Sequence, residues 1–322
     1  MRVEYLVSAK SIYRIYDMEL RHLRYFLAVA DERHFTRAAA KLGLSQPPLS
    51  LQIRQLEEEM GARLFRRLSR GVELTEAGEA LVPHARLMIA DAAKAGEIAR
   101  RAARGETGEL RLGLSGSTPN HPSVPGLIRA FRNAYPGVSI SIRETHSAAL
   151  IAALEDREID AALVLEPTGY GKGLVELTLL TKELVAVLAE DHPLARERIV
   201  VLSTLAGEPF ILVPRAVGPG WHDLVTAACR DAGFSPNVTQ ESSRTSSAAH
   251  FVAAGLGVTI VPGWLASTPV AGVAYRPIAP PTPAARVALV YRRDSNTALA
   301  RNFLRLARAV AGSAAAAERG VC

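Results

Sequence analysis

The sequence has few cysteines, few aromatic residues and no long apolar run. Its 322 residues include two cysteines, Cys229 and Cys322, which form neither a C-x-x-C pair nor a spacing typical of metal ligands. We therefore expect a reduced, cytoplasmic setting, with no structural metal and no cofactor. No stretch is long enough to cross a bilayer, so we expect no membrane partner.

The N-terminal segment also lacks the features of a targeting signal. Residues 1–17 have neither the apolar core nor the small-residue cleavage site of a signal peptide. We expect them to be a disordered extension ahead of Met18 or the product of a misplaced start codon.

Charge is distributed unevenly along the chain. The formal net charge is +6 and the pI is about 9.5, values compatible with a nucleic-acid partner. Residues 18–75 hold ten Lys or Arg residues against seven Asp or Glu residues, so positive charge is concentrated near the N-terminal end. The length suffices for two or three domains, and a hydrophobic content of 48% is enough for real cores.

Small, apolar and hydroxyl residues over 35–53 have the spacing of a helix-turn-helix. Thr36 is a candidate N-cap of the first helix, and Gly43 stands where the turn needs a left-handed backbone. Ser45 opens the second helix. An inward face of that helix is predicted from Leu49, Ile53, Leu56 and Met60. The opposite face would enter the major groove of duplex DNA, and it carries Gln46, Pro47, Ser50, Leu51 and Arg54.

The start of the second helix has an unusual composition. An N-cap hydroxyl normally accepts from the second or third helical N–H, but Pro47 and Pro48 have no N–H to donate. We therefore hypothesise that the Ser45 hydroxyl contacts a phosphate or a base edge.

A short basic wing is predicted after this helix, over 61–75. Arg66, Arg67 and Arg70 flank a turn at Gly71, and they suit phosphate contact. The alternatives are a solvated basic surface and a helical hairpin with no DNA role. The predicted DNA contacts are Thr36, Arg37, Ser45, Gln46, Pro47, Ser50, Leu51, Arg54, Arg66, Arg67 and Arg70.

The stretch 20–75 resembles the DNA-binding domain of LysR-type transcriptional regulators. The resemblance is carried by runs such as Phe35-Thr36-Arg37-Ala38-Ala39, Leu44-Ser45-Gln46-Pro47 and Leu64-Phe65-Arg66-Arg67. It implies a winged helix-turn-helix that binds DNA as a dimer or tetramer. The family often has arginine where this chain has Leu51, and leucine favours a thymine methyl over guanine.

One long helix is predicted from Thr75 to Arg104, within a linker over 76–105. Thr75 is its expected cap, and Pro83 is expected to bend it. Its apolar stripe needs a partner, which the family resemblance implies is the same helix of a second subunit. Packing against the chain's own C-terminal domain is the alternative.

Strands and helices alternate from residue 109, which predicts an α/β fold with a mostly parallel sheet. The resemblance to the LysR family implies a two-lobed effector-binding domain like that of periplasmic binding proteins. We expect one lobe over 109–182 and 284–311, a second over 183–283, and a loose tail over 312–322. The stretches 212–215, 232–234 and 252–258 are similar to the branch that senses aromatic acids or their breakdown products.

A ligand is expected where strand ends converge between the lobes. Hydroxyls and helix N-terminal amides there suit a carboxylate, although each serine is also a plausible simple N-cap. The predicted effector contacts are Ser115, Ser117, Thr145, Ser147, Pro214, Arg215, Gly218 and Ser246. The aromatic-acid branch often has a basic residue after the strand ending at Leu165, where this chain has Glu166, and Arg215 is the candidate to supply that charge.

Two other classes of protein are alternatives to a DNA-binding regulator. A solute-binding protein of a transporter would share the two lobes but not the DNA-binding segment. An enzyme is disfavoured because the run 113–117 is one residue short of G-x-S-x-G, and because Gly255-Leu256-Gly257 precedes a strand and lacks a third glycine.

Overall fold

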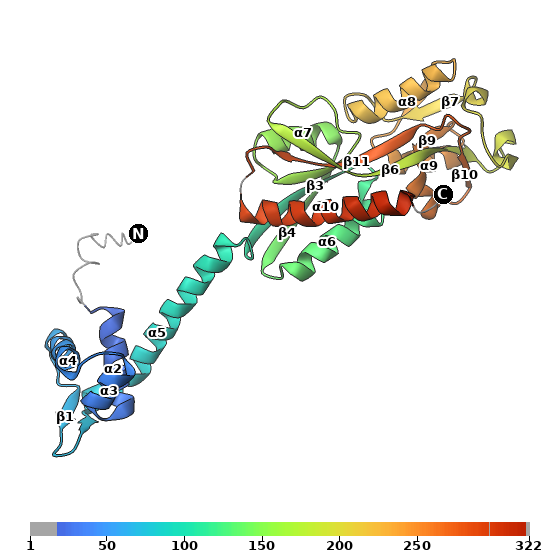
Figure 1. The fold of residues 1–322 in the computed structure, drawn as a ribbon. Helices are drawn as coiled ribbons and strands as arrows, with labels where there is room; N and C mark the ends of the chain where they lie inside the picture. Colours follow the sequence, from blue (N-terminus) through green and yellow to red (C-terminus); the bar gives the residue numbers. More distant parts are fainter. Residues whose placement is uncertain (1–17, 296, 320–322) are drawn as a thin grey trace, which may run out of the picture. The chain divides into compact units, whose positions relative to one another are not determined.

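The structure, a computed structural model, describes residues 18–295 and 297–319. The chain forms two compact units that divide between Arg100 and Arg101 (Figure 1). The prediction for 1–17 lies outside the described residues.

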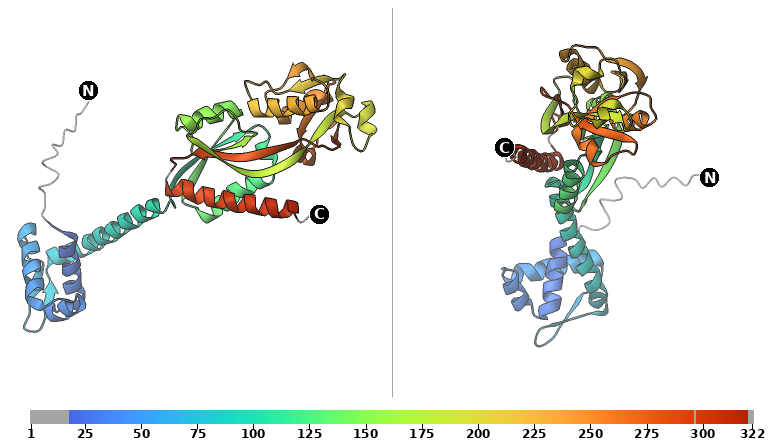
Figure 2. Two further views of the ribbon diagram at one scale, coloured as in Figure 1. Left: turned by 45° about the horizontal axis from the view of Figure 1, so that its top comes forward. Right: turned by 90° about the vertical axis from the view of Figure 1, so that its right-hand side faces the viewer.

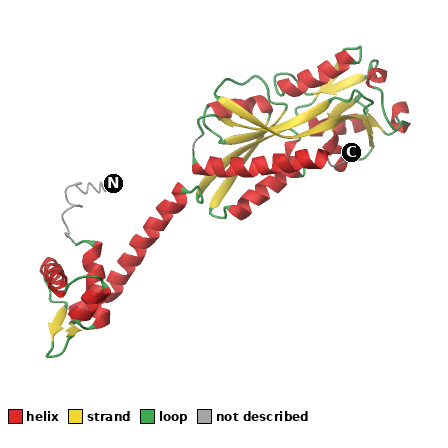
Figure 3. Cartoon of the chain, viewed as in Figure 1, coloured by secondary structure: helices red, strands yellow, loops and turns green. Residues whose placement is uncertain are grey.

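The first unit combines helices with a two-stranded wing (Figure 3). Its helices are α2 (Leu20–Glu32), α3 (Phe35–Lys41) and α4 (Gln46–Met60), followed by strands β1 (Phe65–Arg67) and β2 (Val72–Leu74). The strands pair antiparallel around the turn at Gly71. This is the winged helix-turn-helix that the sequence predicted.

The core of this unit explains why the helices pack so closely. Phe26, Leu49 and Leu56 are fully buried, and the tilted ring of Phe65 lies 5.4 Å from that of Phe26. Ala38 and Ala39 of α3 are also buried, and their small side chains let the neighbouring helices approach.

Two expectations about the turns have different outcomes. Gly43 has φ +70°, so the predicted left-handed backbone is confirmed. The N-cap predicted at Thr36 is wrong. Helix α3 begins at Phe35, and the ring Nδ1 of His34 caps it by accepting from the Thr36 N–H at 3.2 Å.

Helix α5 spans Glu76–Ala103 and continues through Pro83. The Thr75 hydroxyl accepts from the Gly78 N–H at 3.1 Å, as expected of its cap. Three large apolar side chains on α5 remain exposed, Leu87 at 62%, Met88 at 44% and Ile98 at 55%.

The second unit is built on a seven-stranded sheet in the order β10-β6-β11-β5-β3-β4, with β9 joined to β6. Strands β3 (Gly108–Ser115), β4 (Val138–Thr145) and β5 (Ala161–Leu165) pair in parallel, as the alternating pattern predicted. The prediction of a mostly parallel sheet is wrong, because the pairs of β11 with β5 and β6, and of β6 with β9 and β10, are antiparallel and make the sheet mixed. The strands β6 (Leu174–Ala189) and β11 (Ala284–Arg292) run antiparallel to each other along the sheet (Figure 2).

Helices cover both faces of the parallel strands. On one face, α6 (Ser123–Ala134) and α10 (Ala298–Arg319) pack side by side over Ala161 and Leu163. On the other face, α7 (Ser147–Glu155) packs over Ala162 and Val164. Alternate residues of β5 therefore fill two separate cores, which explains why the whole strand is apolar.

A third core defines the other lobe. It gathers β7 (Pro209–Leu212), β9 (Thr259–Pro262) and β10 (Val273–Pro277) with α8 (Pro219–Asp231) and α9 (Thr245–Ala253). The mostly exposed β8 (Asn237–Glu241) pairs in parallel with β7. Four 3₁₀ turns, Thr118–Asn120, Pro193–Arg196, Leu202–Leu205 and Gly263–Ser267, complete the connections.

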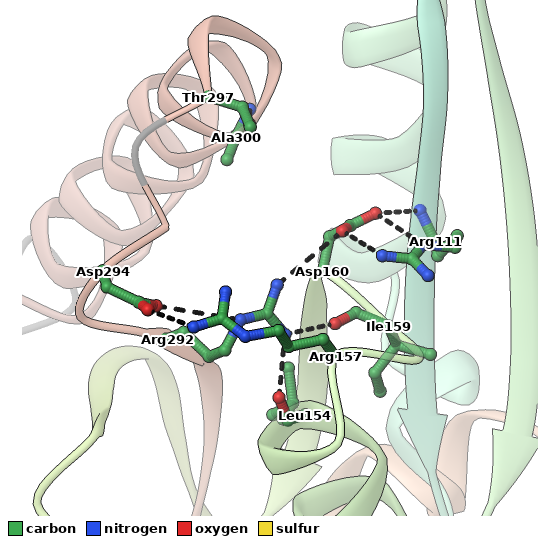
Figure 4. Close-up of polar contacts among 9 residues, drawn as sticks. All are labelled: Arg111, Leu154, Arg157, Ile159, Asp160, Arg292, Asp294, Thr297 and Ala300. Carbon is green, nitrogen blue, oxygen red and sulfur yellow. Dashed lines mark hydrogen bonds and ion pairs between the residues drawn. The ribbon is translucent and has the colours of Figure 1, made fainter.

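A polar network joins residues near the starts of β3 and β5 to the end of β11 (Figure 4). The Asp160 carboxylate accepts from the backbone N–H and the guanidinium of Arg111, each at 2.8 Å. Arg292 donates to the carbonyl oxygens of Leu154 and Ile159. The Arg292 guanidinium thus binds one carbonyl in the last turn of α7 and one just before β5.

The sequence interpretation missed two features of this unit. These are strand β10 at Val273–Pro277 and the first half of β6, which starts at Leu174. The loose tail predicted over 312–322 is wrong for 312–319, because α10 continues to Arg319.

Candidate DNA-binding and effector-binding sites

The outer face of α4 is exposed as predicted. Gln46, Pro47, Leu51 and Arg54 are exposed and Ser50 is partly exposed. The Gln46 amide donates to the Ser50 hydroxyl at 2.8 Å, while Arg54 lies 3.8 Å from Glu58. These weak surface contacts leave the face available for exchange with base edges or phosphates.

Ser45 is the N-cap of α4, and its side chain makes no capping hydrogen bond. This agrees with the absence of donors at Pro47 and Pro48. Its contact with DNA stays a prediction.

Thr36 and Arg37 lie in the first turn of α3, and both are exposed. The Arg37 guanidinium donates to the Glu32 carbonyl oxygen at 2.7 Å.

The wing is tied to α4 through Glu57, whose side chain is only 8% exposed. Its carboxylate accepts from the backbone N–H groups of Leu64 at 2.9 Å and Phe65 at 3.1 Å. Arg63 also donates to it at 2.8 Å. The sequence interpretation missed this carboxylate, which fixes where the wing leaves the helix.

The wing arginines differ in their surroundings although all three are exposed. Arg66 forms an ion pair with Glu73 across the strands, and the Arg67 guanidinium lies 5.9 Å from the ring centre of Phe35. Between wing and helix is a groove of about 570 Å³, whose lining includes Ser50, Leu51, Arg54 and Arg67.

The second unit contains a cavity of about 260 Å³ between its lobes. The N-terminal ends of α7, α8 and α9 all reach it, through Ser147, Gly218 and Thr245. Unpaired N–H groups at helix starts favour negative charge. The lining residues are Ser115, Gly116, Glu144, Thr145, His146, Ser147, Leu165, Val213, Val217, Gly218, Trp221, Ser243, Arg244 and Thr245.

Four of the predicted effector contacts line this cavity, namely Ser115, Thr145, Ser147 and Gly218. Ser115 is 1% exposed, and its hydroxyl oxygen accepts from the Leu165 N–H at 2.9 Å. That hydroxyl therefore joins β3 to β5 and still has its own hydrogen to donate.

The other four predicted contacts lie elsewhere. Arg215 pairs with Asp223 at 2.8 Å on the surface, which raises the pKa of the arginine and lowers that of the aspartate. Pro214, Ser117 and Ser246 are absent from the described lining, Ser117 being fully buried. Ser246 is the second residue of α9, so the preceding Thr245 faces the cavity instead.

The sequence interpretation also missed the charged residues of the cavity. Arg244, at the N-cap of α9, donates to Glu144, at the end of β4, with 2.5 Å between Nη1 and Oε1. The two residues lie far apart in sequence and in different lobes, so no local pattern could pair them.

The residue after β5 is Glu166, where the aromatic-acid branch often has a basic residue. Its backbone has φ +46°, and its carboxylate accepts from the Arg286 backbone N–H at 2.5 Å. Burial raises the pKa of Glu166 against the opposing effect of Arg286. The side chain is thus bound to β11 and does not line the cavity.

Over 18–295 and 297–319, no three His, Cys, Asp or Glu side chains are grouped to hold a metal ion. No helix of the part that the structure describes combines the length and apolar character needed to cross a bilayer.

An exposed helix-turn-helix face and a ligand-sized cavity in a separate unit define a DNA-binding regulator that responds to a small molecule. Residues 20–79 match the family model of the bacterial regulatory helix-turn-helix protein, lysR family, and residues 103–312 match the LysR substrate binding domain. The chain belongs to the LysR family of transcriptional regulators. The DNA-binding match also decides against a transporter's solute-binding protein.

Individual relatives agree over most of the chain. The HTH-type transcriptional regulator YnfL of Escherichia coli is 38% identical over 288 residues, covering 89% of this chain and 97% of the relative. AlsR of Bacillus subtilis is 36% identical, covering 90% and 95%. The crystal structure of CbnR, a LysR family transcriptional regulator, has a TM-score of 0.80 at 27% identity and covers 90% of this chain and 100% of that one.

Proposed function

We propose that this regulator responds to a small carboxylate bound in the cavity between its lobes. The observation that carries the proposal is the meeting of three helix N-termini at one cavity. Such a cavity favours an anion, and the apolar side chains of Leu165, Val217 and Trp221 suit the rest of a small organic acid.

The proposed DNA contacts are the exposed face of α4, the Ser45 hydroxyl and the wing arginines. A dimer would present two recognition helices to matched half-sites of a two-fold operator. The exposed Leu87, Met88 and Ile98 of α5 support self-association through that helix. CbnR, a structural neighbour, has been solved in complex with its target DNA, with a TM-score of 0.79 at 26% identity.

The protein would act in the cytoplasm by binding rather than by catalysis. An effector would shift the arrangement of lobes and subunits only through its different affinity for the two states. The assignment to the aromatic-acid branch stays a prediction.

A thermal-shift screen of small carboxylates tests the effector. A ligand that binds the native state raises the melting temperature, by an amount that grows with its concentration relative to Kd. Stabilisation by an acid supports the proposal. Stabilisation by neutral sugars with no response to any acid contradicts it.

Electrophoretic mobility shift with the promoter beside the protein's own gene tests DNA binding. A specific shift is expected, and Gln46→Ala with Arg54→Ala should weaken it. A promoter occupancy unchanged by replacing Gln46, Ser50 and Arg54 together would refute the proposed recognition face.

A further inference from the structure

The cavity lining includes one guanidinium and one carboxylate. These belong to Arg244 and Glu144, and the two side chains pair across the lobes at 2.5 Å. Both are partly open to solvent, with 48% and 43% of their side-chain surfaces exposed. The ion pair is therefore accessible to a ligand that enters from solution.

A ligand with only a carboxylate is poorly matched to this pair. If it bound the donors of Arg244 that Glu144 does not use, its carboxylate would lie close to that of Glu144, and one guanidinium would face two negative charges. Like charges at that separation repel one another. A ligand that also carries an ammonium group would satisfy Glu144 at the same time as Arg244.

We infer that the effector is a zwitterion, an amino acid with a small apolar side chain, which inserts between Glu144 and Arg244. The inference rests on the proposed carboxylate site in the same cavity. One internal ion pair is replaced by two pairs to the ligand, so neither side chain loses its partner.

An orphaned hydroxyl marks the carboxylate end of this site. Thr245 is 4% exposed, it lines the cavity as the first residue of α9, and its Oγ1 has no hydrogen-bond partner. A buried hydroxyl without a partner is costly, and a ligand carboxylate beside Arg244 would accept from it. Glu144 and the adjacent Thr145 would hold the ammonium group.

The remaining surface sets the size of the side chain. Leu165, Val213, Val217 and Trp221 form an apolar wall. The volume of about 260 Å³ lies below the roughly 300–1,000 Å³ of sites for drug-sized ligands. Short aliphatic amino acids fit these limits.

Isothermal titration of the full-length protein with matched compounds tests the inference. The amino acids are L-alanine, L-valine and L-leucine, and their deaminated counterparts are propionate, 3-methylbutanoate and 4-methylpentanoate. At least one amino acid should bind about tenfold or more tightly than its counterpart, a preference of about 1.4 kcal/mol.

Two variants test whether the preference for the amino acid depends on the ion pair between Glu144 and Arg244. Glu144→Gln should bring the affinity ratio of amino acid to acid close to one. Arg215→Gln is the control, because it removes an exposed charged side chain of the second lobe that does not line the cavity. It should leave the ratio unchanged.

The outcomes separate the two proposals. If none of the three amino acids binds, or if none of them binds more tightly than its deaminated counterpart, the zwitterion inference is overturned. Binding of the acids alone would still leave the carboxylate site intact. Melting temperatures raised by neutral compounds only would overturn both.

Discussion

The indole Nε1 of Trp264 donates a hydrogen bond to the carbonyl oxygen of Ser117, 3.2 Å away and fully buried. Ser117 follows β3 of the first lobe, while Trp264 belongs to the 3₁₀ turn after β9 of the second. The bond joins the lobes directly beside the loop that carries Gly116 into the cavity.

Trp264→Phe should destabilise the second unit. It removes one of the two donors to the Ser117 carbonyl oxygen, which keeps its bond from the Asn120 N–H at 3.1 Å, so the expected loss is that of one hydrogen bond, about 0.5–1.5 kcal/mol. The expected fall in the melting temperature is roughly 1–6 °C for a domain of this size. Differential scanning calorimetry measures it, with far-UV circular dichroism as a check that the fold is retained. An unchanged melting temperature would contradict the role of this bond.

Gly220→Ala should weaken effector binding and lower stability. A Cβ at Gly220 would lie 1.9 Å from the Glu166 carbonyl oxygen, so the start of α8 must move away from the first lobe. Overpacking of this kind costs about 1–3 kcal/mol. Gly126→Ala in α6 is the control, since its Cβ would meet nothing within 4 Å, and it should stabilise by up to about 1 kcal/mol. Equal effects of the two substitutions in thermal unfolding would refute the argument.

Glu57→Gln should loosen the wing. An amide has one acceptor oxygen where the carboxylate serves Leu64, Phe65 and Arg63, so at least one donor loses its partner. We expect a loss of about 1–3 kcal/mol in the stability of the first unit and weaker binding to all DNA sequences. The surface substitution Glu58→Gln should change stability by less than about 0.5 kcal/mol. Urea denaturation and filter binding distinguish the two variants.

Ser45→Ala should reduce DNA affinity at unchanged thermal stability. The hydroxyl makes no capping bond, so its removal leaves the helix without a loss. An N-cap that did bond to the helix would cost about 1 kcal/mol on the same substitution. The reverse result, a lower melting temperature with normal promoter binding, would show that the residue acts only within the protein.

Ionisation of the Cys229 thiol should lower the free energy of unfolding in alkaline solution. Burial raises the pKa of its thiol from 9.0 to about 11, so the folded state keeps the proton longer than the unfolded state. Its contribution is complete below about pH 9 and is lost as pH rises to about 11, by at most about 3 kcal/mol. Cys229→Val should show a shallower decline in unfolding free energy over that range. Parallel curves for the two proteins would rule out this contribution.

Local patterns of apolar residues in the sequence predicted most of the helices and strands. The spacing of Leu49, Ile53 and Leu56 predicted α4, and the alternation from residue 109 predicted the parallel strands. The N-terminal half of β6 was missed because its polar residues, such as Glu176 and Thr178, lie on an exposed side of a strand that is buried only in part. Strand β10 was missed because Arg276 and Pro277 interrupt its apolar pattern.

The site was predictable only where one segment supplied the contacts. Strand ends identified Ser115, Thr145 and Ser147 because the carboxyl ends of parallel strands share one edge of the sheet. Arg215 was assigned a place in the cavity from its position after a strand, and its pairing with Asp223 depends on the helix that follows. Arg244 lines the cavity and Arg215 does not, a difference that depends on the tertiary structure and not on the local sequence.

The two longest strands of the second unit are continuous through both lobes. Leu174–Ala189 pairs with Ala284–Arg292 near one end and with Val273–Pro277 near the other. The lobes are therefore not exchangeable modules, because any cut between them severs the shared ladder. Recombination that swaps ligand specificity among such proteins must transfer the whole sheet, or else alter single side chains around the cavity.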